Sequence, residues 1–233
     1  MLVPQHEVAP VVGTSGLRGD YNMTVTAAPI PFAGSMLGAY RHVCVFFSSP
    51  REKYAALLPF VRDGIERGER AYHIIPNRHL AEHLEHLSGA GIDVVAAQDR
   101  HQLQVITAEE TYLRPGHFKI DGMLAYIQEA LTGGATLGFP LTRLIGYPES
   151  MLEDLSGMNE FVEFETRLND VLPSYTDPVI CLYDTNLLTG TLAVDILRTH
   201  PVTVIGGLLY ENPFFVPPQE FLRQIQQRSG VPA

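Results

Sequence analysis

The sequence predicts an α/β fold in which a mainly parallel sheet carries helices on both faces, giving three layers. Short apolar runs alternate along the chain with longer amphipathic segments. The apolar runs lack the in–out alternation of half-exposed strands, and continuous runs are typical of parallel strands that are buried on both faces. With 233 residues, of which 45 % are hydrophobic, the chain is long enough to bury the core of such a domain.

The predicted strands are the apolar runs themselves, which are rich in residues that favour extended backbone. The run from His42 to Phe47 comes first, and Gly206 and Gly207 separate the last two runs. The predicted strands are residues 42–47, 70–75, 103–107, 143–145, 179–183, 202–205 and 208–210.

The predicted helices lie between these strands. In the first, Ser49 at the N-cap, Pro50 at the first helical position and Glu52 two residues later form a capping box. Pro59 lies inside the same helix and predicts a kink or a shifted start. Asp121 is expected to cap a later helix. The predicted helices span about 50–68, 78–88, 92–100, 121–131, 160–171, 192–198 and 219–227.

The two ends of the chain differ from its centre. Residues 1–35 contain several prolines and glycines and show no helical stripe, which predicts a flexible N-terminal arm. Residues 36–228 are expected to form one domain, and residues 229–233 are expected to fray.

Charge and composition exclude several classes of protein. The net charge of −10 argues against direct nucleic-acid binding, which needs clustered Lys and Arg. Two cysteines cannot form a disulfide framework, so buried reduced thiols of a cytoplasmic protein are expected. The sequence shows neither a long apolar stretch that would span a membrane nor an N-terminal secretory signal.

The sequence lacks the common catalytic motifs. The residues after the first predicted strand, FSSPREKY at 47–54, contain none of the glycines of a phosphate loop, and Pro50 removes a backbone amide that would face phosphate. No G-x-G-x-x-G follows a strand and no G-x-S-x-G nucleophile elbow occurs. The sequence therefore assigns neither catalytic residues nor a cofactor.

The candidate ligand-binding residues follow from the fold class, because parallel sheets bind ligands at the carboxyl ends of their strands. Aromatic candidates for a pocket wall are Phe47, Tyr112, Tyr147, Tyr183 and Phe214. Polar candidates are His42, Glu109, Glu149, Asp184 and Asn212. A mostly apolar wall with a few polar groups is what a pocket for a small organic ligand needs.

One helix carries three histidines on the same face. His79, His83 and His86 lie at positions i, i+4 and i+7, a spacing that would allow a shared metal ion. Leucines on the other face make the same segment an ordinary amphipathic helix, so a solvated histidine face is expected and a metal site is the alternative.

Several runs together resemble a known family. They occur in this order: HVCVFF at 42–47, LPFVRDGIERGE at 58–69, AEETYL at 108–113, EFETRLN at 163–169, CLYD at 181–184, LRTHP at 197–201 and ENPFF at 211–215. This set is similar to the MEDS domain, the methanogen/methylotroph sensory domain named after the dichloromethane regulator DcmR. The resemblance covers about residues 40–222.

The resemblance implies a RecA-like α/β fold without a phosphate loop, which acts as a sensor of simple hydrocarbon derivatives. Family members are usually joined to a DNA-binding or kinase module. This chain has no room for one, so a regulatory protein, a kinase or self-association is expected to transmit the signal. The chain departs from the family at the turn after the fourth strand. A Gly-Glu-Met-like turn is common there, whereas Pro148 displaces Glu149 in this chain.

The leading hypothesis is therefore a non-enzymatic sensory domain. Two alternatives stay open: a residual nucleotide- or metal-dependent hydrolase, and a protein-interaction module without a ligand. Binding of Mg-ATP or a metal would distinguish the first, and the size of the protein in solution would bear on the second.

Overall fold

A seven-stranded sheet forms the centre of the protein in a computed structural model that describes residues 28–111, 118–149 and 158–228. The strands lie in the order β5-β4-β6-β7-β3-β8-β9; all are parallel except β9, which is antiparallel to β8. Their bounds are β3 His42–Phe47, β4 Arg70–Ile75, β5 Leu103–Thr107, β6 Thr142–Gly146, β7 Val179–Asp184, β8 Val202–Ile205 and β9 Leu208–Glu211. The predicted strands and the mainly parallel sheet are confirmed.

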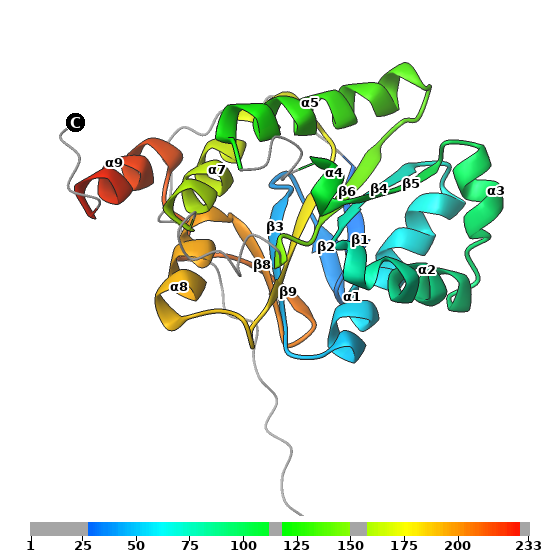
Figure 1. Ribbon diagram of the computed structural model, residues 1–233, viewed down its shortest axis with the longest axis horizontal. Helices are drawn as coiled ribbons and strands as arrows, with labels where there is room; N and C mark the ends of the chain where they lie inside the picture. The colour runs from blue at the N-terminus through cyan, green and yellow to red at the C-terminus, as the bar shows by residue number, and fades with distance from the viewer. Residues whose placement is uncertain (1–27, 112–117, 150–157, 229–233) are drawn as a thin grey trace, which may run out of the picture.

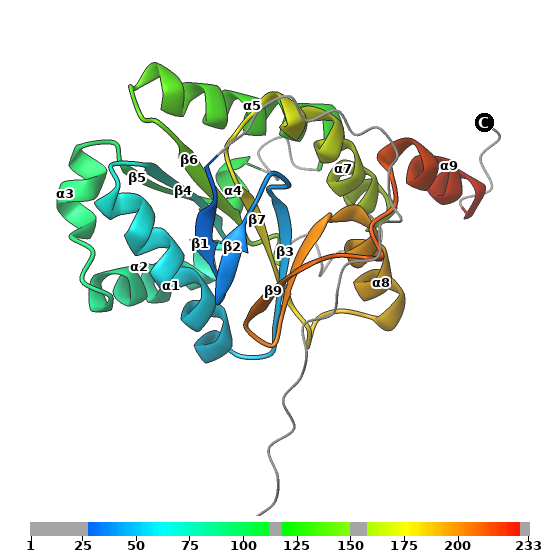
Figure 2. The same cartoon turned by 180° about the vertical axis from the view of Figure 1, so that it is seen from behind.

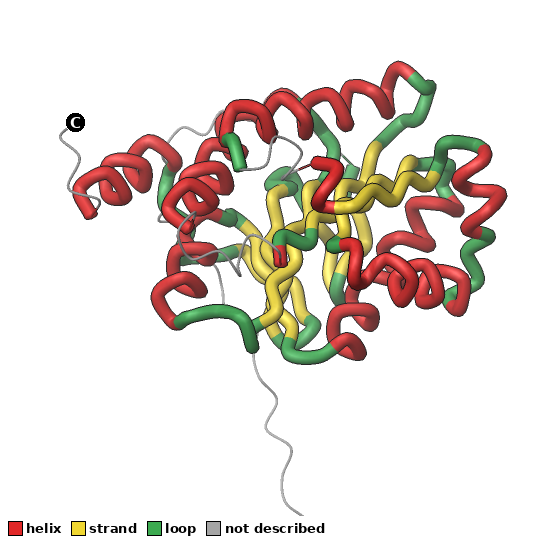
Figure 3. Tube along the Cα trace, viewed as in Figure 1, coloured by secondary structure: helices red, strands yellow, loops and turns green. Residues whose placement is uncertain are grey.

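The helices cover both faces of the sheet (Figures 1 and 3). Helices α1 Pro50–Glu66, α2 Leu80–Gly89 and α3 Val94–Asp99 lie on one face. Helices α5 Ile120–Thr136, α7 Met158–Val171, α8 Gly190–Thr199 and α9 Pro218–Arg228 lie on the other. The short elements are η1 Asn77–His79, α4 Ala108–Thr111 and η3 Leu172–Ser174. This arrangement is the predicted three-layer fold.

The direction of the chain across the sheet explains which helix covers which face. The chain runs from β3 across to β4 and β5, and then returns through β6 and β7 to β8. Because crossovers between parallel strands are right-handed, helices of the outward path and the return path fall on opposite faces. Along β3, Val43 and Val45 pack toward α1, whereas Cys44 and Phe46 belong to the core under α7. The sheet thus separates two apolar cores.

Helix α1 begins as the capping box predicts. The Oγ of Ser49 accepts a hydrogen bond from the Glu52 amide at 3.3 Å, and Pro50 occupies the first turn. The Glu52 carboxylate accepts from the amide of Ser48 at 2.8 Å, one residue before the N-cap. The helix continues through Pro59 to Glu66, so the proline does not end it.

Helix α5 starts differently from the prediction. It begins at Ile120 with Lys119 as the N-cap residue, so the expected cap at Asp121 is wrong. The Asp121 carboxylate instead accepts a hydrogen bond from Arg167 on α7 at 2.9 Å. An ion pair between two helices has replaced the local capping contact.

A short hairpin corrects part of the expected N-terminal arm. Strands β1 Ile30–Phe32 and β2 Ser35–Leu37 pair antiparallel and pack beside α1 (Figure 2). Ile30, Phe32 and Leu37 are buried, and the Phe32 ring lies 4.6 Å from the ring of Phe60. Residues 30–35 therefore belong to the domain, because burial of these side chains stabilises strands too short to form alone. Residues 1–27 and 229–233 lie outside the described residues.

The buried guanidinium of Arg143 joins β6 to helix α1. It contacts the carboxylates of Asp63 at 2.7 Å and Glu69 at 2.5 Å, and donates to the carbonyl of Phe60. Gly64 leaves the room for this side chain, because a Cβ there would lie 2.7 Å from Arg143. Two partly buried acids therefore balance the charge of a guanidinium that is itself fully buried.

Two buried histidines, His73 on β4 and His83 on α2, face each other under α1. His73 Nδ1 lies 2.9 Å from His83 Nε2, and Tyr54 Oη lies 3.3 Å from His83 Nδ1. Burial lowers the pKa of His73 from 6.5 to about 3 and lowers the pKa of His83 in the same direction. Both imidazoles are therefore neutral in the folded protein near neutral pH.

We expect this pair to make the protein sensitive to acid. In the unfolded chain His73 is protonated below about pH 6.5, whereas in the folded protein its pKa is about 3. Between these pH values the unfolded chain therefore binds one more proton at His73 than the folded protein does. Stability is therefore full above pH 6.5 and falls with falling pH, by about 1.4 kcal/mol per unit for each such histidine. His73→Gln should reduce the slope of unfolding free energy against pH by about that amount between about pH 6 and pH 4. Urea unfolding at several pH values measures this slope, and an unchanged slope would contradict the assignment.

Candidate functional site

Ionisable and aromatic side chains gather where β3, β4 and β6 end, at the carboxyl edge of the sheet. Glu149, three residues after β6, is 6 % exposed. Its Oε2 accepts hydrogen bonds from Arg78 at 2.9 Å and from His79 at 2.7 Å. Its Oε1 accepts from the hydroxyl of Tyr147 at 3.0 Å. Residues that follow two different strands thus hold this buried carboxylate in place.

Lys53, in the first turns of α1, provides a buried cation at the same edge. Its side chain is 4 % exposed, and its Nζ lies 4.6 Å from the ring of Tyr54, 4.9 Å from Tyr147 and 5.6 Å from Phe47. Among the residues that the structure describes, no carboxylate pairs with it. Burial lowers the pKa of Lys53, although the negative charges of Glu82 and Glu149 oppose the shift.

Three of the predicted site residues meet at this edge, and two others line it. Phe47 packs edge-on against Tyr147, with ring centroids 5.7 Å apart, beside Glu149. Glu109 is the second residue of α4 and accepts a hydrogen bond from the amide of Asn77 at 3.3 Å. Asp184 ends β7 and accepts from the amide of Asn186, so it caps a turn. Tyr112 lies outside the described residues.

The other four predicted residues lie elsewhere. His42 begins β3 and therefore stands at the opposite, amino edge of the sheet. Tyr183 faces the core under α7, where its hydroxyl donates to Glu165. Asn212 donates to the carbonyls of Leu197 and His200 at the end of α8, and Phe214 is exposed. The structure thus does not bring the ten predicted residues into one pocket.

Two of the three histidines around α2 share a partner, because His79 and His86 each lie 3.6 Å from the Glu82 carboxylate, whereas His83 turns into the core. His79 contacts Glu149, His83 is buried against His73, and the His86 ring stacks on Tyr54 at 3.7 Å. They do not converge on a common point, since the imidazoles of His79 and His83 are engaged by separate residues.

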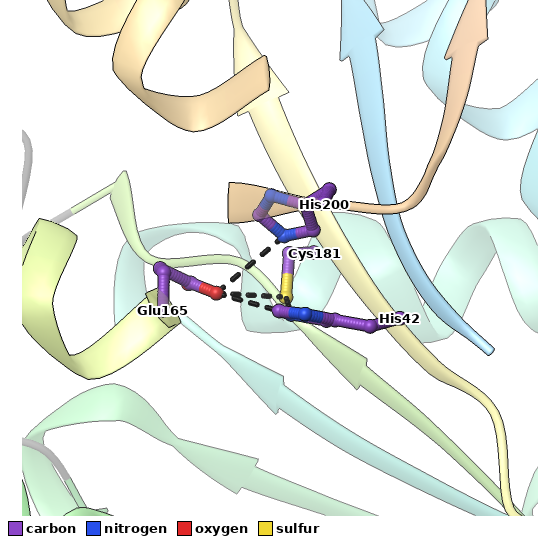
Figure 4. Close-up of side chains that lie close together, drawn as sticks. All are labelled: His42, Glu165, Cys181 and His200. Atoms are coloured by element: carbon purple, nitrogen blue, oxygen red, sulfur yellow. Dashed lines mark hydrogen bonds and ion pairs between the residues drawn. The ribbon is translucent and has the colours of Figure 1, made fainter. Parts of the chain in front are cut away.

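A second polar cluster lies in the core under α7, near the amino end of β3. It contains His42, Glu165 of α7, Cys181 of β7 and His200, which precedes β8, and all four are buried (Figure 4). Burial and the charge of Glu165 raise the pKa of the Cys181 thiol, and burial lowers the pKa of His200. Within the described residues, these are the side chains whose donor atoms converge closely enough to share an ion.

Sequence reasoning missed Lys53 and three members of this buried cluster. Lys53 lies within the run FSSPREKY, and the apolar residues on the same helix, Leu57 and Val61, were the available signal that a lysine there would be buried. Glu165, Cys181 and His200 lie within the runs EFETRLN, CLYD and LRTHP, and each run places a metal-binding side chain among core residues. That shared chemistry was the available signal.

The family was decided by a match to the model described as MEDS, the MEthanogen/methylotroph, DcmR Sensory domain, which spans residues 41–201. The chain belongs to the MEDS family. A search of curated proteins found no match. The crystal structure of the KaiC-like protein PH0186 from Pyrococcus horikoshii OT3 has a similar fold, with a TM-score of 0.50 at 14 % identity over 75 % of this chain and 71 % of that one.

These comparisons assign a sensory role to the MEDS domain and support the RecA-like α/β description of its fold. Within the described part of the chain, no helix has the length and apolar character needed to cross a membrane.

Proposed function

We propose that this MEDS domain binds a small organic molecule at the carboxyl edge of its sheet, and that it acts as a sensor without catalysing a reaction. The observation that supports this most is the ammonium of Lys53, which is buried among three aromatic rings without a paired carboxylate in the described residues. A buried charge is costly unless it is paired. A ligand that supplies an anionic or hydrogen-bond-accepting group would compensate it.

The surroundings of Lys53 suit a simple hydrocarbon derivative with one polar group. Phe47, Tyr54 and Tyr147 offer apolar surface, and cation–π contacts keep the ammonium in place before the ligand arrives. Arg78 offers a second cation, because its guanidinium is half-exposed while it pairs with Glu149. A short organic acid fits this chemistry best.

The same edge argues against a nucleotide. The chain passes from β3 to α1 through Ser48 and Ser49, and Pro50 follows in the first helical turn. Glycines that would let the backbone approach phosphates are absent there, and the amide of Glu52 is already bonded to Ser49. We therefore favour the sensor over the hydrolase.

The signal would pass through the groups that hold Glu149. A ligand anion that draws Arg78 or His79 away from Glu149 would favour one arrangement of η1 and the turn after β6 over another. Binding transmits a signal only when the ligand has different affinities for two states. A regulatory protein, a kinase or a second copy of the chain would bind one of the two arrangements at this edge more tightly than the other.

Thermal unfolding of the purified chain with a panel of short organic acids, alcohols, and methylated and chlorinated compounds tests this function. Mg-ATP forms a separate arm. A ligand that binds the folded state adds about 2.7 kcal/mol at a hundredfold excess over its dissociation constant. We expect a dose-dependent rise with one organic class and none with Mg-ATP.

Lys53→Met tests the residue behind the proposal, and Lys119→Met is the matched control at an exposed lysine. Methionine fills the same space without a charge, so the variant should fold at least as stably as the parent. We expect Lys53→Met to lose the ligand response and Lys119→Met to keep it. A response to Mg-ATP alone, or an equal ligand response in both variants, would contradict the proposal.

A further inference from the structure

The four side chains of the buried cluster place their donor atoms at the corners of a small polyhedron (Figure 4). His42 Nε2 lies 3.2 Å from Glu165 Oε2, and His200 Nε2 lies 3.5 Å from the same oxygen. Cys181 Sγ lies 3.7 Å from His42 Nε2 and 3.8 Å from Glu165 Oε2. All four atoms lie within 4.8 Å of one another.

We propose that His42, Glu165, Cys181 and His200 bind one divalent metal ion, and that zinc is the ion they fit best. Zinc bonds to nitrogen and oxygen at about 2.0–2.2 Å and to sulfur at about 2.3 Å, so ligands at tetrahedral angles stand about 3.3–3.8 Å apart. Four of the six separations, from 3.2 to 3.8 Å, are close to those edges, and the two others, from His200 to His42 and to Cys181, lie within 4.8 Å. This site goes beyond the proposed sensor function and does not depend on it.

Both imidazoles are already in the tautomer that a metal needs. His42 Nδ1 donates to Asn169 Oδ1 at 3.0 Å. The orientation of the Asn169 amide is fixed, because its Nδ2 donates to the carbonyl of Thr199 at 2.7 Å. His200 Nδ1 donates to the carbonyl of Ile196 at 2.8 Å. Each ring therefore turns an Nε2 lone pair toward the cluster, and such outer hydrogen bonds are typical of metal-binding histidines.

A buried nitrogen of His200 without a hydrogen-bond partner gives independent support for a bound ion. Its side chain is fully buried, and its Nε2 has no hydrogen-bond partner in the described structure. A buried nitrogen in this condition costs free energy. A metal ion at the centre of the cluster would accept its lone pair.

The carboxylate of Glu165 is also arranged for a single bond to an ion. Its Oε1 accepts a hydrogen bond from Tyr183 at 2.9 Å, which leaves Oε2 to face the two imidazoles. The hydroxyl of Tyr183 thus orients the Glu165 carboxylate, in the same way that Asn169 orients the His42 ring. Each of these hydrogen bonds uses an atom that does not face the centre of the cluster, so it does not compete with the ion.

Charge selects the valence of the ion. The thiolate of Cys181 and the carboxylate of Glu165 together carry two negative charges, and the two imidazoles are neutral ligands. A divalent cation makes the buried cluster neutral, whereas a monovalent one would leave an uncompensated charge. Cys181 must lose its proton on binding, so uptake of the ion releases one proton to solvent.

A small pocket borders the site at His42, and the four protein ligands suggest the role of the site. His42 and Asn169 line a small pocket of about 30 Å³ beside Tyr40 and Pro201. Four protein ligands leave no open position for a substrate, which is the arrangement of structural zinc. The ion would join β3, β7, α7 and the end of α8 at one point.

Without an ion, a proton would have to lie between His42 Nε2 and Glu165 Oε2, which are 3.2 Å apart, and His200 Nε2 would still have no hydrogen-bond partner. This protonated pair is the rival explanation. It predicts a cluster that holds no metal.

Elemental analysis of the full chain, purified without a histidine tag or chelator, separates the two explanations. Cys181→Ser removes the ligand sulfur. Cys44→Ser is the matched control, because Cys44 lies beside Cys181 in the sheet but bonds to Thr203 at 3.3 Å. We expect about one zinc ion per chain in the parent and in Cys44→Ser, and roughly tenfold less in Cys181→Ser.

Cobalt(II) added to the metal-free parent gives a second readout. A thiolate-to-cobalt charge-transfer absorption should appear with one equivalent and persist in Cys44→Ser. This readout decides the matter even if Cys181→Ser does not fold. Absence of zinc from the parent together with absence of the cobalt band would overturn the proposal, as would loss of the band in a folded Cys44→Ser variant.

Discussion

Replacing Arg143 with methionine is expected to lower the free energy of unfolding by about 3–5 kcal/mol, because it removes the buried cation between Asp63 and Glu69 and leaves Asp63 paired with the exposed Arg67. The Arg143 side chain is 1 % exposed, whereas those of Asp63 and Glu69 are 27 % and 13 % exposed. Water can partly solvate the two acids in the variant, so a value near the lower end of the range is expected. Methionine keeps most of the volume, so loss of charge pairing dominates the effect.

Urea unfolding of Arg143→Met measures this change, with Arg62→Met as the matched control. Arg62 pairs with Glu66 at 3.8 Å on the same helix α1, where both side chains are more than half exposed. Exposed pairs contribute about 0–1 kcal/mol, so the control should unfold almost as the parent does. Equal losses in the two variants would show that burial does not determine the contribution of Arg143.

Removal of the inferred zinc ion should have the next largest effect. An ion present at a thousandfold excess over its dissociation constant stabilises the folded chain by about 4 kcal/mol. For a chain of this size that corresponds to roughly 10 °C in the unfolding midpoint. A chelator should therefore lower the midpoint of the parent and of Cys44→Ser by about that amount.

The Cys181→Ser variant provides the control for chelation. It should already unfold at the lower temperature and respond little to the chelator. A midpoint of the parent that does not change after prolonged incubation with the chelator would contradict a stabilising ion.

The elements that could be predicted from the sequence are those stabilised by contacts between residues that lie close together along the chain. The apolar run at 42–47 and the capping box at Ser49 and Glu52 identify β3 and α1. The spacing of Met123, Ile127 and Leu131 identifies the inward face of α5. The residues that stabilise these elements lie within one or two turns of each other, so a single sequence reveals them.

The elements that were missed depend on distant contacts. Strands β1 and β2 have three residues each, and packing of Phe32 on Phe60 supports them. Asp121 is a plausible cap by type, yet Arg167 on another helix engages it. Local patterns cannot show such partners.

Part of the candidate site could also be predicted from the sequence, and part could not. Phe47, Tyr147 and Glu149 were predicted to lie together because parallel strands end at the same edge of a sheet. The buried cluster draws on residues 42, 165, 181 and 200, which share no spacing pattern. Only the sheet order, which places β3 between β7 and β8, brings them within reach.

Hydrogen exchange of the backbone amides, with and without the compound that raises the unfolding temperature, locates the ligand on the protein. We expect added protection in the peptides that contain Lys53, Arg78 and Tyr147, at the carboxyl edge of the sheet. A groove of about 730 Å³ lined by Arg70, Tyr126 and their neighbours lies beside α5 and offers a different place for the ligand. Protection confined to the peptides of that groove would contradict ligand binding at the carboxyl edge.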